Sequence, residues 1–201
     1  MRSIKLFAIA GLLGLTALTA VGVLHLRERR QAEEVARQAI PGGKFAVDWQ
    51  GPAEVVDGDT LRLPQGKVRL LGIDAFEKRQ TCNGVPCGRE ATAMMQALVL
   101  GKTVHCTGNG DDRYGRLLAY CDTGRTHDLG GAMVLSGWAL SYVNYSHYYD
   151  PFQNEARIAH AGAWAKGFVL TPWEWRRQQN DDATDAARIA IDAATRMQLN
   201  Q

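Results

Sequence analysis

Residues 68–77 read Val-Arg-Leu-Leu-Gly-Ile-Asp-Ala-Phe-Glu, a short apolar run with an arginine near its start and two carboxylates at its end. The turn-forming residues Pro-Gln-Gly precede it at 64–66, and polar residues follow it. This length and these boundaries are typical of a buried strand. Because such a strand seldom ends in acids, Asp74 and Glu77 are the first candidates for a functional role.

A second acidic pair, Asp57 and Asp59, lies one turn upstream. Residues 60–63 and 67–73 are expected to pair as a hairpin, which would bring Asp59 and Asp74 toward each other. Two carboxylates held close together repel, so the arrangement requires a shared proton, a cation or a nearby arginine.

Three motifs together resemble the signature of the staphylococcal nuclease (thermonuclease) family. They are Val56–Leu61 (Val-Asp-Gly-Asp-Thr-Leu), Arg69–Asp74 (Arg-Leu-Leu-Gly-Ile-Asp) with Glu77, and Asp112–Tyr120 (Asp-Arg-Tyr-Gly-Arg-Leu-Leu-Ala-Tyr). Their order and spacing are similar to those of the family, and the similarity extends over Phe45 to Arg177. It implies an α+β fold that is mainly β, a five-stranded OB-type barrel with an inserted helix and C-terminal helices. It also implies cleavage of DNA and RNA to 5′-hydroxyl and 3′-phosphate ends.

The acids fit the metal and proton-transfer chemistry of that reaction. Asp59 and Asp74 are hard oxygen donors suited to Ca²⁺, and the resemblance implies that they bind it. The resemblance assigns Glu77 the activation of water as general base. Ala75 stands where the family often has threonine, so it would serve the metal through its carbonyl alone. Phe76 replaces a common proline, so the loop that aims Glu77 loses a rigid φ constraint.

Arginines and tyrosines are the expected contacts to the substrate. Arg69 and Arg116 can each donate bidentate hydrogen bonds to phosphate oxygens, and by resemblance they correspond to the family's two phosphate-binding arginines. The expected substrate-binding set is Arg113, Tyr114, Tyr142 and Tyr145. The tyrosines can stack on or hydrogen-bond a nucleotide, but packing at the core or rim of the domain is an equally good explanation for them.

The four cysteines are an even set, which favours disulfides. Cys82 and Cys87 are five residues apart and can close a small loop, and Cys106 and Cys121 lie about equally far from an intervening turn, as cross-strand partners would. A zinc site is the alternative, but no histidine stands at ligand spacing. Disulfides imply an oxidising compartment outside the cytoplasm.

Leu6–Leu24 is a run of 19 uncharged residues. As a helix it would be about 28 Å long, enough for a hydrocarbon core of roughly 30 Å. The run is long for a cleaved signal and its end is a poor cleavage match, which favours a membrane anchor over a signal peptide. The expected domains are a signal or transmembrane segment (1–30), a linker (31–44), a nuclease domain (45–178) and a polar tail that can form a helix (179–201).

Further elements follow from apolar spacing. Apolar residues recur at helical intervals over Glu90–Leu100, and Lys102–Thr107 and Arg116–Asp122 are expected to be the last two strands. Later helices are expected from His127 to Leu135, from an N-cap at Asp150, and over Ala183–Leu199. Trp164, Trp173 and Trp175 are expected to close the domain.

Charge limits how the chain could grip a nucleic acid. Residues 1–40 hold six Arg and Lys against three Asp and Glu, which leaves 17 against 18 in the remainder. A near-neutral domain offers no broad basic surface, so binding would rest on local arginines and a metal. Two functions compete: a Ca²⁺-dependent nuclease acting on DNA or RNA as a monomer, exported or anchored in a membrane, and a catalytically inactive OB-type module that binds nucleic acid or protein.

Overall fold

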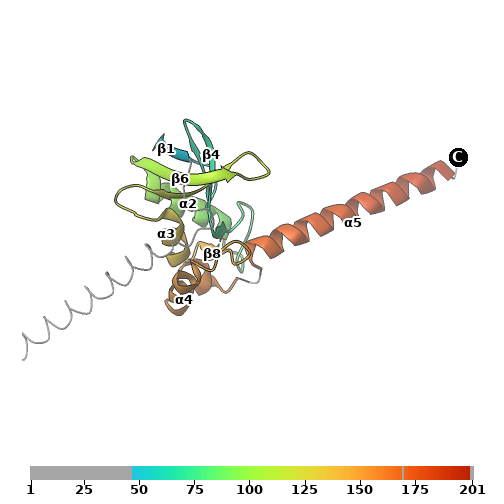
Figure 1. Cartoon of the computed structure of the whole chain (residues 1–201). Coiled ribbons are helices and arrows are strands. Elements are labelled where there is room, and N and C mark those ends of the chain that lie inside the picture. The colour runs from blue at the N-terminus through green and yellow to red at the C-terminus, as the bar shows by residue number, and fades with distance from the viewer. Residues whose placement is uncertain (1–46, 169, 200–201) are drawn as a thin grey trace, which may run out of the picture. The chain divides into compact units, whose positions relative to one another are not determined.

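The computed structural model of the chain describes residues 47–168 and 170–199 (Figure 1). The chain separates into two units, 1–44 and 45–201, and the described residues all belong to the second. The anchor expected at Leu6–Leu24 lies outside the described residues. Within the described ranges, no helix has both the length and the apolar character needed to cross a bilayer.

A curled six-stranded sheet forms the main body of the domain, as expected for an OB-type fold. Its strands lie in the order β1-β6-β7-β4-β3-β2. Their bounds are β1 Val47–Pro52, β2 Glu54–Val55, β3 Thr60–Leu63, β4 Gly66–Leu70, β6 Thr103–Asp111 and β7 Leu117–Asp122. Neighbours pair antiparallel except β4 and β7, which pair in parallel. The expected number of five strands is therefore too low.

The predicted hairpin is confirmed, but its second strand is shorter than predicted. In the β3–β4 hairpin Thr60 lies opposite Arg69. The strand expected over 67–73 breaks after β4, because Gly72 has a φ of +77° and turns the chain out of the sheet. A Cβ at Gly72 would lie 3.1 Å from the ring of Tyr149. The chain then enters a separate two-stranded sheet, in which β5 (Ile73–Ala75) pairs antiparallel with β8 (Ala139–Ser141). Asp74 therefore lies on β5, and β8 is a strand that the sequence pattern did not reveal.

The helices pack beside these sheets. Their bounds are α2 Cys87–Val99, α3 Leu129–Leu135, α4 Asp150–Ile158, a 3₁₀ helix η1 Gly162–Lys166, and α5 Pro172–Leu199. The prediction of Asp150 as an N-cap is wrong, because Tyr149 occupies that position and Asp150 is the first helical residue. The Asp150 carboxylate instead accepts a hydrogen bond of 2.6 Å from Ser141 on β8.

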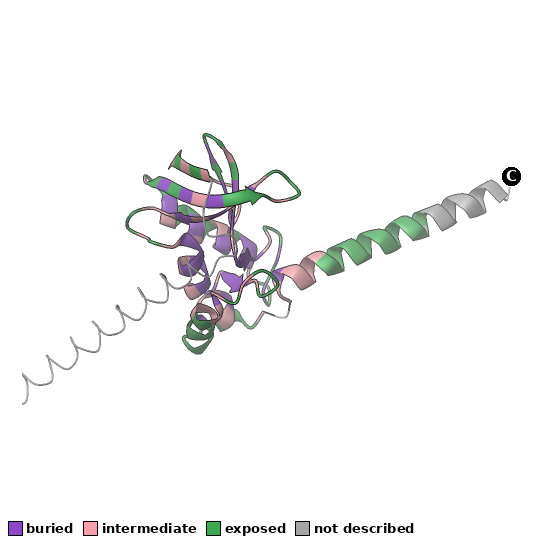
Figure 2. Cartoon of the chain, in the orientation of Figure 1, coloured by how far each residue is buried: buried purple, intermediate pink, exposed green. Residues whose placement is uncertain are grey.

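The C-terminal helix α5 starts eleven residues earlier than Ala183, and the boundary expected at residue 178 falls inside it. Trp173 on α5 and Trp164 pack against the core as predicted. Trp175 lines a cleft, which is described below. From Arg177 to Arg188 the helix is exposed, as the green stretch in Figure 2 shows.

Both predicted disulfides are present, so these four cysteines do not form the alternative zinc site. Cys82 bonds Cys87 and Cys106 bonds Cys121, with Cα–Cα distances of 5.7 Å and 4.1 Å. The second pair joins residues that lie opposite each other on β6 and β7. The described residues include no free cysteine.

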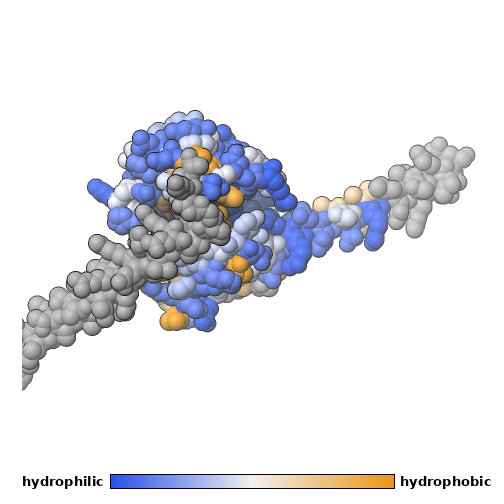
Figure 3. All heavy atoms as spheres, in the orientation of Figure 1, coloured by the Kyte–Doolittle hydropathy of each residue, from blue (hydrophilic) through white to orange (hydrophobic). Residues whose placement is uncertain are grey.

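The core lies between the curled sheet and helices α2 and α3. Its fully buried side chains include Leu61, Val68, Ile73, Met95 and Met133. The face shown in Figure 3 is largely hydrophilic, with small separate apolar patches. Among the described residues, the exposed large hydrophobic side chains are Leu100, Tyr114, Val143, Tyr145 and Ile158, of which Val143 and Tyr145 share the segment between β8 and α4.

Candidate active site

A cleft of about 860 Å³ opens where β4, β5, the β6–β7 loop and the start of α5 meet. It is lined by most of the residues predicted from sequence: Arg69, Glu77, Arg113, Tyr114, Arg116, Tyr142 and Tyr145. Asp57 also lines it. Asp59 and Asp74 lie beneath these residues, at 2% and 0% exposure.

Arg69 joins the two buried aspartates. Its guanidinium donates through Nη1 to Oδ1 of Asp59 and through Nη2 to Oδ1 of Asp74, the latter at 2.8 Å. Asp59 accepts two further hydrogen bonds, from the backbone N–H of Ala75 at 2.7 Å and from the Thr60 hydroxyl at 3.2 Å. The hairpin thus brings the two carboxylates together as predicted, and an arginine balances part of their charge.

The electrostatics of this pair are set by burial. Burial raises the pKa of Asp59 to about 8; the attraction of Arg69 opposes the shift, and the charges of Asp57 and Asp74 add to it. Burial lowers the pKa of Arg69, but Asp59 and Asp74 outweigh it, so the net shift is upward. Arg69 therefore keeps its proton, while Asp59 is a carboxyl group that readily takes one up.

Arg176, on the first turns of α5, is the site residue that the sequence reasoning missed. Its Nη2 donates to Oδ2 of Asp74 at 2.8 Å, and its Nη1 donates to Oδ1 of Asp74 at 3.0 Å and to Oε1 of Glu77 at 2.6 Å. These two acids raise the pKa of Arg176 against the effect of burial, which is the largest single influence. One guanidinium therefore fixes the spacing between Asp74 and Glu77.

Nothing in the local pattern marked Arg176 as a site residue. It stands about 100 residues after Asp74, in the run Pro-Trp-Glu-Trp-Arg-Arg. Adjacent arginines on a helix usually face solvent, as Arg177 does. The usable signal was the group of tryptophans around Arg176, since it indicates that this turn of the helix is docked on the domain.

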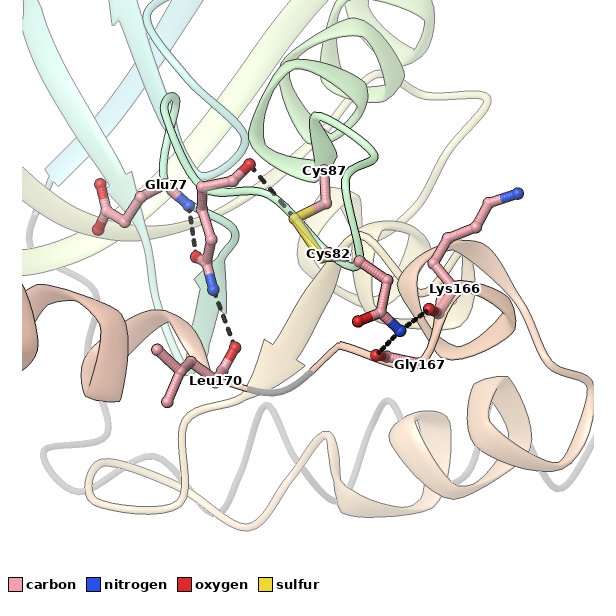
Figure 4. Close-up of a disulfide and its surroundings, with 8 residues drawn as sticks. Glu77, Cys82, Cys87, Lys166, Gly167 and Leu170 are labelled. Carbon is pink, nitrogen blue, oxygen red and sulfur yellow. Dashed lines mark hydrogen bonds between the residues drawn. A yellow bond between two sulfur atoms is a disulfide. The ribbon is translucent and has the colours of Figure 1, made fainter.

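The backbone of Glu77 is held from two sides (Figure 4). The buried amide of Gln80 accepts from the N–H of Glu77 at 3.1 Å and donates to the carbonyl of Leu170 at 2.9 Å. Gly88, at the start of α2, packs so closely on Glu77 that a Cβ there would lie 1.7 Å from its carbonyl oxygen. The Cys82–Cys87 disulfide lies next to these contacts, with the Cys87 sulfur 3.4 Å from the Gln80 carbonyl.

Phe76, expected at a position where the family commonly has proline, is held in place by packing. Its ring is 1% exposed and packs edge-to-face on Phe168, with ring centroids 5.3 Å apart. Its N–H donates to the Trp138 carbonyl at 3.5 Å, a bond that proline could not make. The expected loss of a rigid φ is thus offset by burial of the side chain.

Arg116 is held on the opposite side of the cleft by Asp112. Its Nε donates to Asp112 at 2.8 Å and its Nη2 lies 2.6 Å from the same carboxylate. Nη1 of Arg116 lies 3.4 Å from the hydroxyl of Thr60, the neighbour of Asp59. Burial raises the pKa of Asp112, but the hydrogen bonds from Arg116 and Tyr114 outweigh it and the net shift is downward. Asp112 is therefore an ionised anchor for Arg116.

The four proposed substrate contacts form two groups. Tyr114 is 67% exposed, and the guanidiniums of Arg113 and Arg116 lie 4.9 Å and 5.4 Å from its ring centroid. Tyr142 packs between Tyr145 and Trp173, at centroid distances of 5.1 Å and 5.9 Å. Tyr142 is thus part of an aromatic cluster, whereas Tyr114 and Tyr145 present most of their rings to solvent.

The residues at this site match a hard cation in donor type. Four carboxylates, those of Asp57, Asp59, Asp74 and Glu77, gather around the guanidiniums of Arg69 and Arg176. This excess of carboxylate oxygens is the donor chemistry that Ca²⁺ prefers. The described residues contain no group of three or more His, Cys, Asp or Glu arranged to hold a metal ion. The carboxylates of Asp59 and Asp74 are hydrogen-bonded to arginines. Ala75 contacts Asp59 through its N–H.

Comparison with known proteins points to one family. The model of the family described as "Staphylococcal nuclease homologue" matches residues 67–166, a range that includes Arg69, Asp74, Glu77 and Arg116. An Escherichia coli protein named "Uncharacterized endonuclease" is 38% identical over 159 residues, which covers 71% of this chain and 99% of the relative. A Haemophilus influenzae protein with the same printed name is 36% identical over 135 residues, covering 63% of this chain and 71% of the relative.

A plant protein is similar over a longer stretch of this chain. The "Staphylococcal-like nuclease CAN1" of Arabidopsis thaliana is 28% identical over 170 residues. The match covers 81% of this chain and 48% of the plant protein.

Proposed function

Because the chain belongs to the staphylococcal nuclease homologue family, we propose that its cleft hydrolyses phosphodiester bonds in DNA or RNA with Ca²⁺ as cofactor. The observation that carries the proposal is the arrangement around Arg69. Asp59 and Asp74 share its guanidinium, and Glu77 and Arg116 line the same cleft. The nuclease names of the relatives support the reaction class.

The chain's own residues would divide the chemistry as follows. Glu77 takes a proton from water as the water oxygen attacks phosphorus, and the bond from phosphorus to the 5′ oxygen breaks. The 5′ oxygen leaves with a proton from solvent, which gives the 5′-hydroxyl and 3′-phosphate ends that the family resemblance implies. Arg69 and Arg116 donate to the non-bridging oxygens, where negative charge develops. Asp59, Asp74 and the carbonyl of Ala75 would hold Ca²⁺, which supplies charge neutralisation at the phosphate.

The cleft also offers contacts to the rest of the substrate. Tyr114, with Arg113 beside its ring, presents a flat face and a positive charge on one side. Tyr145 presents an exposed ring on the other side, supported by Tyr142. Bases that stack on these rings would be bound without regard to sequence.

One observation favours a second function. The carboxylates of Asp74 and Glu77 are both neutralised by Arg176, which is also what a purely structural ion-pair network would look like. A catalytically inactive OB-type module that binds nucleic acid or protein is therefore the alternative.

Cleavage assays decide between the two functions. Single-stranded DNA, double-stranded DNA and RNA are each incubated with the protein in Ca²⁺ and in excess chelator. The nuclease proposal predicts cleavage in Ca²⁺ that stops in chelator, with 5′-hydroxyl and 3′-phosphate ends. Intact substrate at saturating Ca²⁺, bound by the folded protein, would establish the inactive module instead.

We also propose that the domain works outside the cytoplasm, as a monomer joined to a membrane through residues 6–24. Both disulfides support an oxidising compartment. Intact-mass measurement of protein extracted from membranes tests the anchor, since a mature chain that starts near residues 21–31 would show cleavage. Sedimentation in detergent tests the monomer.

A further inference from the structure

Arg176 contacts the site from helix α5, which supplies no residue to the proposed reaction. It belongs to α5, while the acids it contacts lie on β5 and in the loop that follows β5. Its guanidinium makes a two-pronged contact with Asp74 and shares one nitrogen with Glu77, at distances of 2.6–3.0 Å. Such planar forks on a carboxylate are among the stronger ion pairs in proteins.

The hydrogen bonds on Asp74 leave little room for a cation. Each carboxylate oxygen offers about two lone-pair positions. Oδ1 of Asp74 accepts from both Arg69 and Arg176, and Oδ2 accepts from Arg176. One position on Oδ2 remains, but a cation that takes it lies beside the Arg176 guanidinium, whose like charge repels it. This repulsion is relieved when one of the two guanidiniums moves away from Asp74.

Arg176 is the arginine that can leave more readily. Arg69 lies within β4, its side chain is 16% exposed, and it also contacts Asp59 and the Ile73 carbonyl. The Arg176 side chain is 36% exposed, and the residues that follow it are exposed from Arg177 to Arg188. Displacing Arg176 leaves Asp74 paired with Arg69, whereas displacing Arg69 removes the guanidinium that joins both buried aspartates.

We propose that Arg176 is a positioning residue that holds Asp74 and Glu77 together in the metal-free protein and is displaced from Asp74 when a divalent cation binds. It thereby determines the cation concentration at which the site fills. This inference rests on the proposed Ca²⁺ site. It couples the C-terminal helix to metal binding, so the first turns of α5 should loosen when the cation enters.

Calcium titration of the full-length protein in detergent tests the inference without any cleavage measurement. The variant is Arg176→Gln, and the matched control is Arg177→Gln, which removes the same charge from the neighbouring exposed position. By isothermal titration calorimetry, the dissociation constant of Arg176→Gln should fall roughly tenfold, because a positive charge in contact with a ligand oxygen is gone. The control should stay within about twofold of the wild type, since exposed charges are screened.

Hydrogen exchange of backbone amides gives a second test, because part of the protein is expected to exchange faster when Ca²⁺ is bound. Ligands normally slow exchange around their site, and this is expected for residues 57–60 and 73–77. The inference predicts that amides of residues 172–180 exchange faster in Ca²⁺ than in chelator in the wild type. In Arg176→Gln that difference should disappear.

The outcomes separate this inference from the nuclease proposal. If the wild type binds Ca²⁺ and Arg176→Gln binds it with equal or weaker affinity, Arg176 is only a structural contact and the inference falls while the nuclease proposal stands. If neither protein binds Ca²⁺, the calcium part of the proposed function falls, and the inference with it. If Arg176→Gln does not fold, Arg176→Lys decides: it keeps the charge but loses the fork, and its affinity should rise by roughly twofold to fivefold.

Discussion

Asp59 is a buried carboxyl group whose surroundings disfavour its ionised form. It is 2% exposed, and burial raises its pKa to about 8 although Arg69 contacts it. In the unfolded chain an aspartate titrates near pH 4, roughly. Since the folded-state pKa is the higher one, folding favours the protonated form. The stability from this group is therefore fully present below about pH 4 and is lost as pH rises through about 8.

This gives a prediction for the metal-free protein. In chelator, the free energy of unfolding measured in urea should fall from pH 5 to pH 8, with a contribution from Asp59 of up to about 1.4 kcal/mol per pH unit. Asp59→Asn keeps the shape and cannot ionise, so the difference between wild type and variant isolates this slope. Saturating Ca²⁺ should flatten the slope, because a cation favours the ionised carboxylate. If the free energy of unfolding of wild type and of Asp59→Asn changes equally with pH in chelator, Asp59 does not have a raised pKa in the folded protein.

At the scale of elements, the two disulfides have different consequences. Cys106–Cys121 closes a 15-residue separation between paired strands of the main sheet. Cys82–Cys87 closes a five-residue separation in the loop that carries Gln80, which in turn holds the backbone of Glu77. The first bond should therefore matter mainly for stability and the second mainly for the geometry of the site.

Paired serine variants test this division, and each serves as the control for the other. Replacing Cys106 and Cys121 should cost about 2–4 kcal/mol of unfolding free energy and leave the turnover of the folded fraction near wild type. Replacing Cys82 and Cys87 should cost less stability, because a shorter loop is closed, but should lower turnover. Urea unfolding and initial cleavage rates measure both. Equal effects of the two pairs on turnover would show that the loop disulfide has no special role in positioning Glu77.

Helix α5 combines a docked start with an exposed remainder. Thr171 and Glu174 cap its first turn through hydrogen bonds of 2.6–3.4 Å, and Trp173 packs on the core. Exposed residues from Arg177 to Arg188 bury little surface, so their helical structure adds little to the stability of the domain.

A pair of truncations tests this view of the helix. A chain that ends at residue 182 keeps Arg176 and should match the full chain in melting temperature and cleavage rate. A chain that ends at residue 171 loses Trp173 and Arg176 and should melt at a lower temperature. A large loss of stability in the chain that ends at residue 182 would mean that the exposed part of α5 is docked in solution.

At the scale of the whole molecule, sequence reasoning succeeded where contacts are local and patterned. Asp59 precedes β3 and Asp74 follows β4, so the β3–β4 hairpin brings them together, and both cysteine pairs followed from their even number and their spacing. It failed where tertiary contacts decide. The left-handed turn at Gly72 divides one expected strand between two sheets, and β8 is a strand only because it pairs with β5.

Two residues of the site, Arg176 and Gln80, could not be predicted from the sequence for the same reason, since their roles depend on tertiary contacts. Arg176 contacts acids about 100 residues earlier in the chain, and no local period encodes such a contact. Gln80 was equally hidden, since a polar residue in a loop gives no hint that its amide is buried between Glu77 and Leu170. Both become visible only when the C-terminal segment is placed against the loop after β5.

If Glu77 is the general base of a nuclease site, the variant Glu77→Gln should fold and bind Ca²⁺ but lose its cleavage activity. Glutamine keeps the size of the side chain and an oxygen that can accept from Arg176, but it cannot take the proton. The control is Glu54→Gln, which changes an exposed carboxylate paired with Arg62 at the opposite edge of the hairpin. Both variants are compared with the wild type in melting temperature and Ca²⁺ affinity.

The deciding measurement is the single-turnover rate of DNA and RNA cleavage at saturating Ca²⁺. We expect Glu77→Gln to lower this rate by roughly 10² to 10⁴ while its Ca²⁺ affinity changes far less, and Glu54→Gln to cleave at the wild-type rate. If folded Glu77→Gln cleaves at the wild-type rate, Glu77 is not the base and the proposed mechanism is wrong.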